Sequence, residues 1–136
     1  MESIKRFFST EDIFAQHTGI ELQDVQLGCA KAKMKIEPFH LNGAKTVHGG
    51  AIFTLADFVF AVASNSHGKL AMGINTSISF VKAPLSGILY AEAKEQSRNS
   101  KLASYSVTIT DESGDVVAIF QGMVYLKKES LEFNIN

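Results

Sequence analysis

The sequence predicts an α+β domain in which an antiparallel β-sheet wraps around one long central helix. The stretch from Thr46 to Asn65 opens with two glycines and then carries apolar residues on every face of a helical wheel. That distribution is typical of a helix buried on all sides. Segments before and after it alternate apolar and polar residues with the period of a β-strand. Short turns join these segments, as in an antiparallel sheet. The expected order is a short helix, one or two strands, the long helix and four strands.

Length and composition indicate the class of protein. The 136 residues are enough for one domain, residues 1–136, and 46% hydrophobic residues with 20% charged residues are ordinary for a globular protein. A net charge of −1 provides no basic field for a nucleic acid backbone. The single Cys29 has no disulfide partner within the chain. No apolar run resembles a secretory signal or a membrane span. We expect a cytoplasmic protein whose partners include neither nucleic acid nor membrane.

A short amphipathic helix is expected before the sheet. Ser9-Thr10-Glu11-Asp12 resembles a helix start, because hydroxyl side chains precede acidic residues of the first turn. Ile13 and Phe14 give this helix an apolar side. Gly19 is expected to end it in the left-handed conformation that glycine adopts readily.

From residue 20 to residue 36 the pattern changes to a period of two. Small and apolar residues alternate with lysines over residues 30–36, which predicts a strand with one face in the core and one in water. We interpret the lysines as a solvated face that also protects an edge strand from pairing. Glu37-Pro38 ends the strand. Residues 39–47 then form a loop that contains the turn signal Asn42-Gly43.

Four further strands are expected after the central helix. They cover residues 72–82, 88–96, 102–110 and 116–127, with turn-forming residues between them and a polar tail at 130–136. A single small sheet cannot cover every face of a helix. A second copy of the chain is therefore expected to cover the rest, which predicts a homodimer or a larger homo-oligomer.

Asp57 lies in the middle of the apolar central helix. A carboxylate in such surroundings is costly to desolvate without a partner, so Asp57 is either a structural residue bonded to backbone amides or a functional one. His48 and Asp57 are nine residues apart, which places them on opposite sides of a helix with a rise of roughly 13 Å between them. If both serve one site, two chains must build that site.

These residues form a recognisable pattern. The pattern consists of Asn42, then His48-Gly49-Gly50 six residues later, and Asp57 nine residues after the histidine. It resembles the pattern of the hotdog-fold acyl-CoA thioesterases, most closely that of the phenylacetate-degradation (PaaI) branch. The resemblance extends from Gly19 to the final strand. It implies a hotdog fold and hydrolysis of a small or aryl acyl-CoA to a free acid and coenzyme A. It also implies a homodimer or homotetramer that forms the active site. Coenzyme A would be part of the substrate, and neither a separate cofactor nor a metal is expected.

The resemblance implies roles for individual residues. Asp57 matches the family's helical acid, which activates water or attacks the thioester carbonyl across the dimer interface from the glycine turn. Gly49 matches the residue whose amide polarises the carbonyl oxygen, His48 the histidine that shapes the turn, and Asn42 the asparagine that places the nucleophile or substrate. Further candidates for substrate binding are Gly50 in the turn, Asn75 or Thr76 on the strand after the helix, and Arg98, Lys101 and Lys82 near the nucleotide end of coenzyme A.

Physical chemistry agrees with these roles, and each residue also has a structural alternative. An amide at a helix N-terminus lacks an intrahelical acceptor and lies where the helix dipole favours negative charge, which suits a developing oxyanion. Burial would make Asp57 more basic. The two glycines could instead serve close helix–sheet packing, His48 could be a bonded loop histidine, and Asn42 could only form a turn. Arg98 and Lys101 could be ordinary turn charges, and His40 and His67 are expected in turn or surface positions.

Two other functions stay open at the level of sequence. A hotdog-fold hydratase or dehydratase pairs a histidine with an acid on a different spacing. A non-catalytic acyl-CoA binding module would need the groove but not Asp57. A serine hydrolase is disfavoured because the chain has no GxSxG motif.

Overall fold

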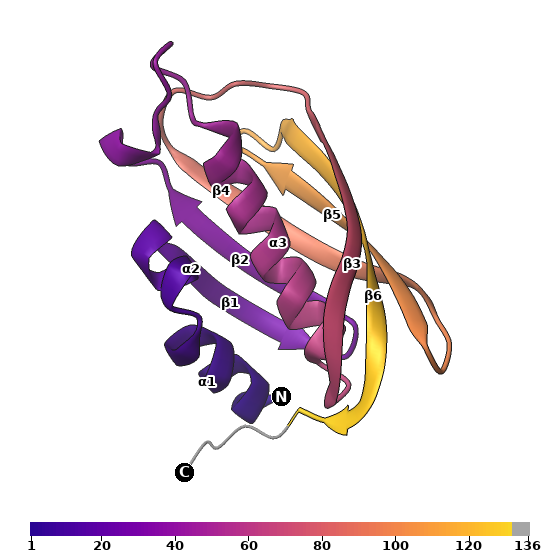
Figure 1. Ribbon diagram of the computed structural model, residues 1–136. Coiled ribbons are helices and arrows are strands. Elements are labelled where there is room, and N and C mark those ends of the chain that lie inside the picture. Colours follow the sequence, from indigo (N-terminus) through magenta and orange to yellow (C-terminus); the bar gives the residue numbers. More distant parts are fainter. Residues whose placement is uncertain (132–136) are drawn as a thin grey trace.

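The structure is a computed structural model that describes residues 1–131, so residues 132–136 of the predicted polar tail lie outside the described residues. The elements and their bounds, drawn in Figure 1, are α1 (Glu2–Glu11), α2 (Ile13–Thr18), β1 (Ile20–Gln26), β2 (Cys29–Lys35), the 3₁₀ helix η1 (Pro38–His40), α3 (Gly49–Asn65), β3 (Lys69–Phe80), β4 (Ile88–Arg98), β5 (Leu102–Thr110) and β6 (Val116–Ser130).

One antiparallel sheet contains all six of these strands, in the order β1-β2-β4-β5-β6-β3. The sheet curves around α3, and α1 and α2 pack beside α3 over β1 (Figure 1). The predicted architecture is therefore confirmed. Strand β5 has the predicted bounds, whereas β4 and β6 continue to Arg98 and Ser130, beyond their predicted ends.

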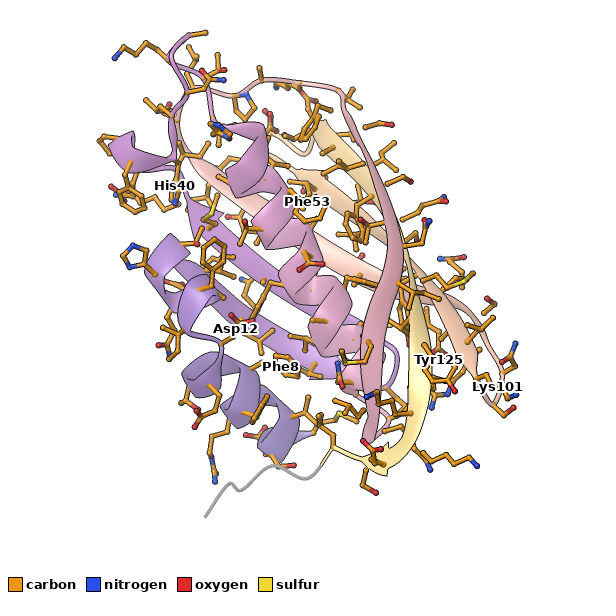
Figure 2. The ribbon with its side chains drawn as sticks, viewed as in Figure 1. Phe8, Asp12, His40, Phe53, Lys101 and Tyr125 are labelled. Carbon is orange, nitrogen blue, oxygen red and sulfur yellow. The ribbon has the colours of Figure 1, made fainter. Side chains whose placement is uncertain are left out.

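The short helix predicted between Ser9-Thr10-Glu11-Asp12 and Gly19 corresponds to α2, and a further helix, α1, precedes it. Asp12 leaves the helical conformation, with φ −83° and ψ 87°, and its side chain accepts the Ala15 N–H at 3.0 Å as the N-cap of α2. Gly19 ends α2 with φ 89°, as predicted. The preceding α1 was not expected, although it buries Ile4 and Phe8 one turn apart on one face. Phe8, which is labelled in Figure 2, contacts Phe58 of α3 edge-to-face, with ring centroids 6.3 Å apart.

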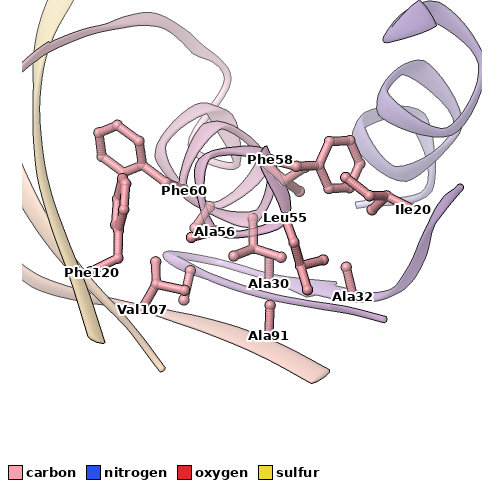
Figure 3. Close-up of a cluster of buried hydrophobic side chains, with 14 of the residues drawn as sticks. Ile20, Ala30, Ala32, Leu55, Ala56, Phe58, Phe60, Ala91, Val107 and Phe120 are labelled. Atoms are coloured by element: carbon pink, nitrogen blue, oxygen red, sulfur yellow. The ribbon is translucent and has the colours of Figure 1, made fainter. Parts of the chain in front are cut away.

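The core lies between α3 and the inner face of the sheet (Figure 3). Over β2 and β4 the helix meets small side chains, because Ala30, Ala32, Ala91 and Ala93 are all buried there. Over β5 and β6 it meets larger ones, including Phe120 and Tyr105, and the ring of Phe60 lies against Gly122. Alternation along β2 and β5 thus places their apolar residues inward, as predicted. On β3, by contrast, Ile74 and Phe80 are exposed.

The position of the lysine-rich strand differs from the prediction. The lysines of β2 face outward as expected, but β2 lies between β1 and β4 and is not an edge. Lys31 pairs with Glu92 at 3.3 Å and Lys33 with Glu21 at 3.7 Å, on the two neighbouring strands. Alternation specifies which face a residue occupies but not which strand lies beside it, so the prediction of edge protection was wrong.

Helix α3 is not buried on all sides within one chain. Gly50 and Asp57 are exposed, and Thr54 and Ala61 are half-buried. These four residues are spaced by four, three and four positions, so they form one stripe along the helix. In Figure 1, α3 lies between α2 and β3, which leave this side of the helix uncovered. Among residues 1–131 there is no helix with the length and apolarity that crossing a membrane requires.

Candidate active site

The N-terminus of α3 leaves one backbone donor free. His48 is the N-cap, and its Nδ1 accepts the Gly50 N–H at 2.8 Å. The His48 carbonyl accepts the N–H groups of Ala51 at 3.0 Å and Ile52 at 3.2 Å. The Gly49 N–H has no acceptor in the part of the chain that the structure describes. One amide without an acceptor among the described residues therefore lies at the positive end of a 17-residue helix.

Two loops hold this turn in place. The Val47 N–H donates to the carbonyl of Pro84 at 3.0 Å, and the His48 N–H donates to the carbonyl of His40 at 2.7 Å. The first bond fixes the turn to the connection between β3 and β4, and the second fixes it to η1. The His48 ring is exposed and holds the turn through its bond to the Gly50 amide.

His40 has a structural role that the sequence did not reveal. It is buried, its Nδ1 accepts the Glu37 N–H at 2.9 Å, and its Nε2 lies 2.6 Å from the carbonyl of Thr18. These partners indicate the tautomer that carries the proton on Nε2. His40 thus joins the end of α2 to η1, and its own carbonyl holds the His48 amide. It occupies the predicted turn but not a surface position.

Asn42 organises the loop before the glycine turn. Its Oδ1 accepts the N–H groups of Ala44 at 3.0 Å and Thr46 at 3.2 Å, and its Nδ2 donates to the Thr46 hydroxyl at 3.0 Å. Lys45 in the same loop has a left-handed backbone conformation, with φ 66°. Within one chain, then, the Asn42 side chain bonds to its own loop, and it brings that loop to the start of α3.

Asp57 has no hydrogen-bond or ion-pair partner among the residues described. It lies seven residues after Gly50 on the exposed stripe of α3, a rise of roughly 10 Å. Partial desolvation by the surrounding groups, and secondly the negative charge of Asp12, raise the pKa of the Asp57 carboxyl above its ordinary value, although the side chain is exposed to solvent in one chain. An unpartnered carboxylate of increased basicity is suited to general-base or nucleophilic chemistry. Within one chain, Asp57 therefore does not have the alternative, structural role in which its carboxylate would bond to backbone amides.

The other predicted binding residues lie in three places. Asn75 and Thr76 are exposed on β3, where Thr76 pairs with Gly122 across to β6. Lys82 pairs with Asp111 and, at 2.9 Å, with Asp115, which raises its pKa through hydrogen bonds to both carboxylates.

Arg98 and Lys101 lie at the hairpin between β4 and β5, far from the glycine turn within one chain. Figure 2 shows Lys101 and His40 at opposite ends of the molecule. The structure therefore brings Asn42, His48, Gly49 and Gly50 together at one end of α3, and places Arg98 and Lys101 beyond the other end.

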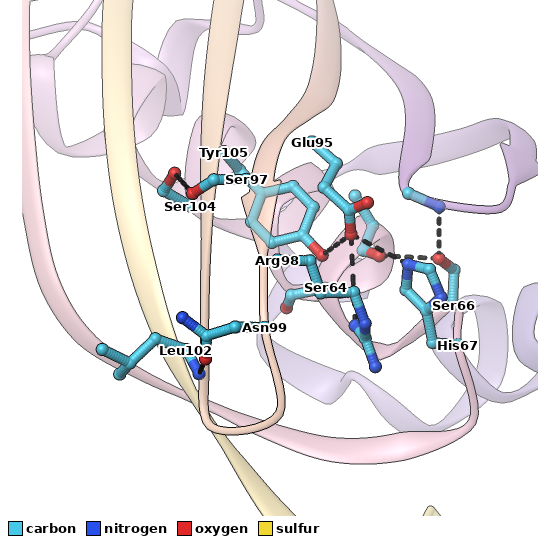
Figure 4. Close-up of polar contacts among 12 residues, drawn as sticks. Ser64, Ser66, His67, Glu95, Ser97, Arg98, Asn99, Leu102, Ser104 and Tyr105 are labelled. Atoms are coloured by element: carbon cyan, nitrogen blue, oxygen red, sulfur yellow. Dashed lines mark hydrogen bonds and ion pairs between the residues drawn. The ribbon is translucent and has the colours of Figure 1, made fainter.

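A polar cluster near the C-terminus of α3 was not predicted. Glu95 accepts the Tyr105 hydroxyl at 2.7 Å, lies 2.8 Å from His67 Nε2 and 4.0 Å from Arg98 (Figure 4). Burial alone would raise the pKa of Glu95, but the hydrogen bonds from Tyr105 and His67 lower it overall. Burial, together with the Glu95 charge, raises the pKa of Tyr105. His67 and Glu95 are 28 residues apart, so no local pattern joins them.

The described residues contain no group of three or more histidine, cysteine, aspartate or glutamate side chains that could hold a metal ion. At the start of α3 the chain provides a backbone donor and a histidine ring, and the Asp57 carboxylate lies further along the same helix. Such a set can stabilise an oxyanion and move a proton.

Comparisons with known proteins agree on one family. Residues 44–118, which contain the glycine turn and Asp57, match the family described as "Thioesterase superfamily". An esterase-like protein of Archaeoglobus fulgidus is 38% identical over 130 residues, which cover 95% of this chain and 84% of that protein. The acyl-coenzyme A thioesterase PaaI of Escherichia coli is 32% identical over 112 residues, covering 82% of this chain and 80% of that protein.

A solved structure supports the same assignment. The E. coli PaaI protein from the phenylacetic acid degradation operon superposes with a TM-score of 0.84 and 27% sequence identity, over 93% of this chain and 96% of that chain. The sequence relatives and the structural likeness thus cover the whole domain around the glycine turn. The chain belongs to the thioesterase superfamily and is a hotdog-fold thioester hydrolase of the PaaI type.

Proposed function

We propose that this protein hydrolyses acyl-CoA thioesters to a free acid and coenzyme A, the activity named for its E. coli relative. The observation that carries this proposal is the free Gly49 N–H at the N-terminus of α3. A thioester carbonyl has one oxygen that becomes an oxyanion when the carbon is attacked. A preorganised amide at the positive end of a helix stabilises that charge.

The proposed reaction uses Gly49 and Asp57. The Gly49 N–H donates to the thioester carbonyl oxygen while the Asp57 carboxylate takes a proton from water. The water oxygen forms a bond to the carbonyl carbon, and the negative charge collects on the carbonyl oxygen. The carbon–sulfur bond then breaks, and the protonated Asp57 returns its proton to the leaving sulfur. In the alternative route, an Asp57 oxygen attacks the carbonyl carbon directly and the carbon–sulfur bond breaks, which releases coenzyme A as its thiolate and leaves a mixed anhydride. Water then hydrolyses the anhydride to the free acid and the Asp57 carboxylate, and a proton from this water neutralises the thiolate.

The proposed site combines two chains. Gly49 and Asp57 are eight residues apart on one helix, a rise of about 12 Å, so they do not reach the same carbonyl from one chain. Strand β3 is an unpaired edge of twelve residues, which are mostly exposed, and such edges pair with another chain unless they are protected. A second copy on this edge covers the exposed stripe of α3. The Asp57 of the partner subunit then faces the glycine turn, and two-fold symmetry creates two equal sites.

The test is release of free thiol from acetyl-, butyryl-, octanoyl- and phenylacetyl-CoA by the wild type and by Asp57→Asn, which keeps the shape and removes the base. We expect wild-type turnover, and a loss of at least about 10²-fold in the variant with an unchanged circular dichroism spectrum. Equal rates for the two proteins would contradict the assignment of Asp57. Tight binding of acyl-CoA without hydrolysis would instead indicate a binding module, and hydration of an enoyl-CoA a hydratase.

Hydrolysis in ¹⁸O-labelled water separates the two routes for Asp57. In a single turnover, the general-base route places the label in the product acid. Attack by the carboxylate, followed by hydrolysis of the anhydride at the aspartyl carbon, leaves the label on Asp57.

A further inference from the structure

An apolar groove of about 600 Å³ opens beside the glycine turn. Its walls come from α2, from η1 and the residue after it, and from the first two turns of α3. His48 and Gly50 line one end of it, and Phe14, Phe39 and Leu41 supply apolar surface. The volume lies within the range usual for sites that bind small molecules.

Two aromatic rings are unusually exposed at this groove. Phe14 of α2 is 67% exposed and Phe39 of η1 is 68% exposed. Large apolar side chains that gather around one concave surface indicate a binding site more often than scattered ones do. The contact between the His40 ring and the Thr18 carbonyl fixes α2 against η1, so the two elements that carry these rings are held at a set distance.

The chemistry of the groove indicates an uncharged, apolar occupant. No lysine, arginine, aspartate or glutamate of the described chain lines it, and its polar lining consists of the histidines His17, His40 and His48 and the threonines Thr18 and Thr54. The groove therefore has no permanently charged group to pair with a phosphate or a carboxylate. The groove is continuous with the turn that carries the free Gly49 amide. A thioester whose carbonyl lies at that amide would therefore place its acyl group along these apolar walls.

We infer that the groove holds the acyl group of the substrate, and that Phe14 and Phe39 make the enzyme prefer acyl groups with a ring or a chain of several carbons over acetyl. This inference rests on the proposed function, because it assumes that the carbonyl binds at Gly49. Each methylene that enters the groove is expected to raise kcat/KM by about fourfold until the groove is filled, from about 0.8 kcal/mol per buried methylene.

The test compares kcat/KM for acetyl-, butyryl-, octanoyl- and phenylacetyl-CoA, which differ only in the acyl group. We expect Phe14→Ala to lower kcat/KM for octanoyl- and phenylacetyl-CoA by about 10-fold or more, chiefly through KM, and to affect acetyl-CoA far less. Phe14→Leu, which keeps an apolar side chain, is expected to restore most of the loss. Ile13→Ala is the matched control, since Ile13 is on the same helix and 66% exposed but does not line the groove.

An equal loss for every acyl-CoA, or the same change in Phe14→Ala and Ile13→Ala, would overturn the inference. A change in the molecular mass of Phe14→Ala in light scattering would overturn it too, because Phe14 would then contact another subunit. If the wild type hydrolyses none of the four esters, the proposed function fails separately. Calorimetric titration with octanoyl-CoA and acetyl-CoA then tests whether the groove binds the acyl group. A loss of affinity in Phe14→Ala for octanoyl-CoA but not for acetyl-CoA supports the inference, and affinities for octanoyl-CoA that are equal in Phe14→Ala and the wild type refute it.

Discussion

At the scale of single residues, the role of the Gly49 N–H group can be tested by substituting proline, which has no backbone N–H. Gly49 is the first residue of α3, a position where proline is tolerated. The preceding His48 has φ −65° and ψ 136°, the extended conformation that a following proline requires. Gly49→Pro is therefore expected to fold and to lose about 10²–10³ in kcat, the usual effect of removing one oxyanion donor.

The matched control for this measurement is Gly49→Ala, which adds a Cβ but keeps the N–H. That Cβ would lie 3.2 Å from the ring of Phe80, whose side chain is exposed and free to shift. We expect steady-state kinetics to show a much smaller loss for Gly49→Ala than for Gly49→Pro. Similar losses would mean that space at this position, and not the amide, matters for catalysis.

Asp12 provides a second prediction at this scale. A general base must be ionised, so kcat/KM should fall as the pH drops through the raised pKa of Asp57. Asp12→Asn removes a negative charge that helps to raise this pKa, so the acidic limb of the pH–rate profile should move to lower pH. Asparagine caps helices as well as aspartate does, so α2 should persist. The exposed neighbouring change Glu11→Gln should leave the limb in place, and an unmoved limb in Asp12→Asn would contradict the coupling.

The same pKa affects stability in a defined direction. Because the folded state raises the pKa of Asp57, the protonated carboxyl is favoured by folding. This contribution is complete below the unfolded pKa and is lost as the pH rises through the folded pKa. Asp57→Asn is therefore expected to be at least as stable as the wild type near neutral pH, which thermal unfolding at several pH values would show.

The sequence predicted the residues of the glycine turn and their position, since the helix N-terminus and the turn signals are local. It did not predict the bond from His40 to Thr18 or the pair of His67 with Glu95. The partners in these contacts are 22 and 28 residues apart. Only the folded chain shows that His40 connects α2 to the loop that holds the glycine turn.

At the scale of elements, the contact between α3 and β6 depends on a glycine. A Cβ on Gly122 would lie 2.6 Å from Cζ of Phe60, whose ring is buried and cannot move aside. Gly122→Ala is expected to lower the free energy of unfolding in urea by about 1–3 kcal/mol, the usual cost of overpacking. Phe60→Leu in the same chain should recover part of this loss.

Gly43→Ala is the control for that measurement. A Cβ at this loop position meets no atom within 4 Å, and Gly43 has no positive φ. Its effect on the free energy of unfolding is expected to stay within about 0.5 kcal/mol. If Gly122→Ala were equally neutral, the close packing of Phe60 on β6 would be wrong.

Elements also show where a sequence pattern stops being informative. Alternation predicted the inward faces of β2 and β5, and the turns predicted an antiparallel sheet. Alternation does not predict which strands lie next to each other in the sheet. For this reason β2 was interpreted as an edge strand, although β1 and β3 are the edges. Helix α1 was not predicted: the stretch Ser9 to Asp12, which was interpreted as the start of a single helix, contains the end of α1 and the N-cap of α2.

At the scale of the whole molecule, the free edge of β3 is expected to join two chains. Ile74 on this strand is 55% exposed, and Ile74→Asp would bring two like charges close to a two-fold axis, which is destabilising. We expect light scattering to show monomers and thiol release to fall with them. Leu27→Asp, at the tip of the β1–β2 hairpin and 62% exposed, is the control. A monomeric Ile74→Asp with full activity would show that one chain holds the complete site.

The most direct measurement of the shared site is complementation between two inactive variants. Gly49→Pro and Asp57→Asn chains are co-expressed with different tags, and thiol release is compared with that of each variant alone. A mixed dimer has one site with the intact Gly49 amide of one chain and the intact Asp57 of the other. Because half of randomly assorted dimers are mixed and each has one such site, we expect about a quarter of the wild-type rate. If the mixture is as inactive as its parents, the amide and the carboxylate do not act across two chains, and the composite site is wrong.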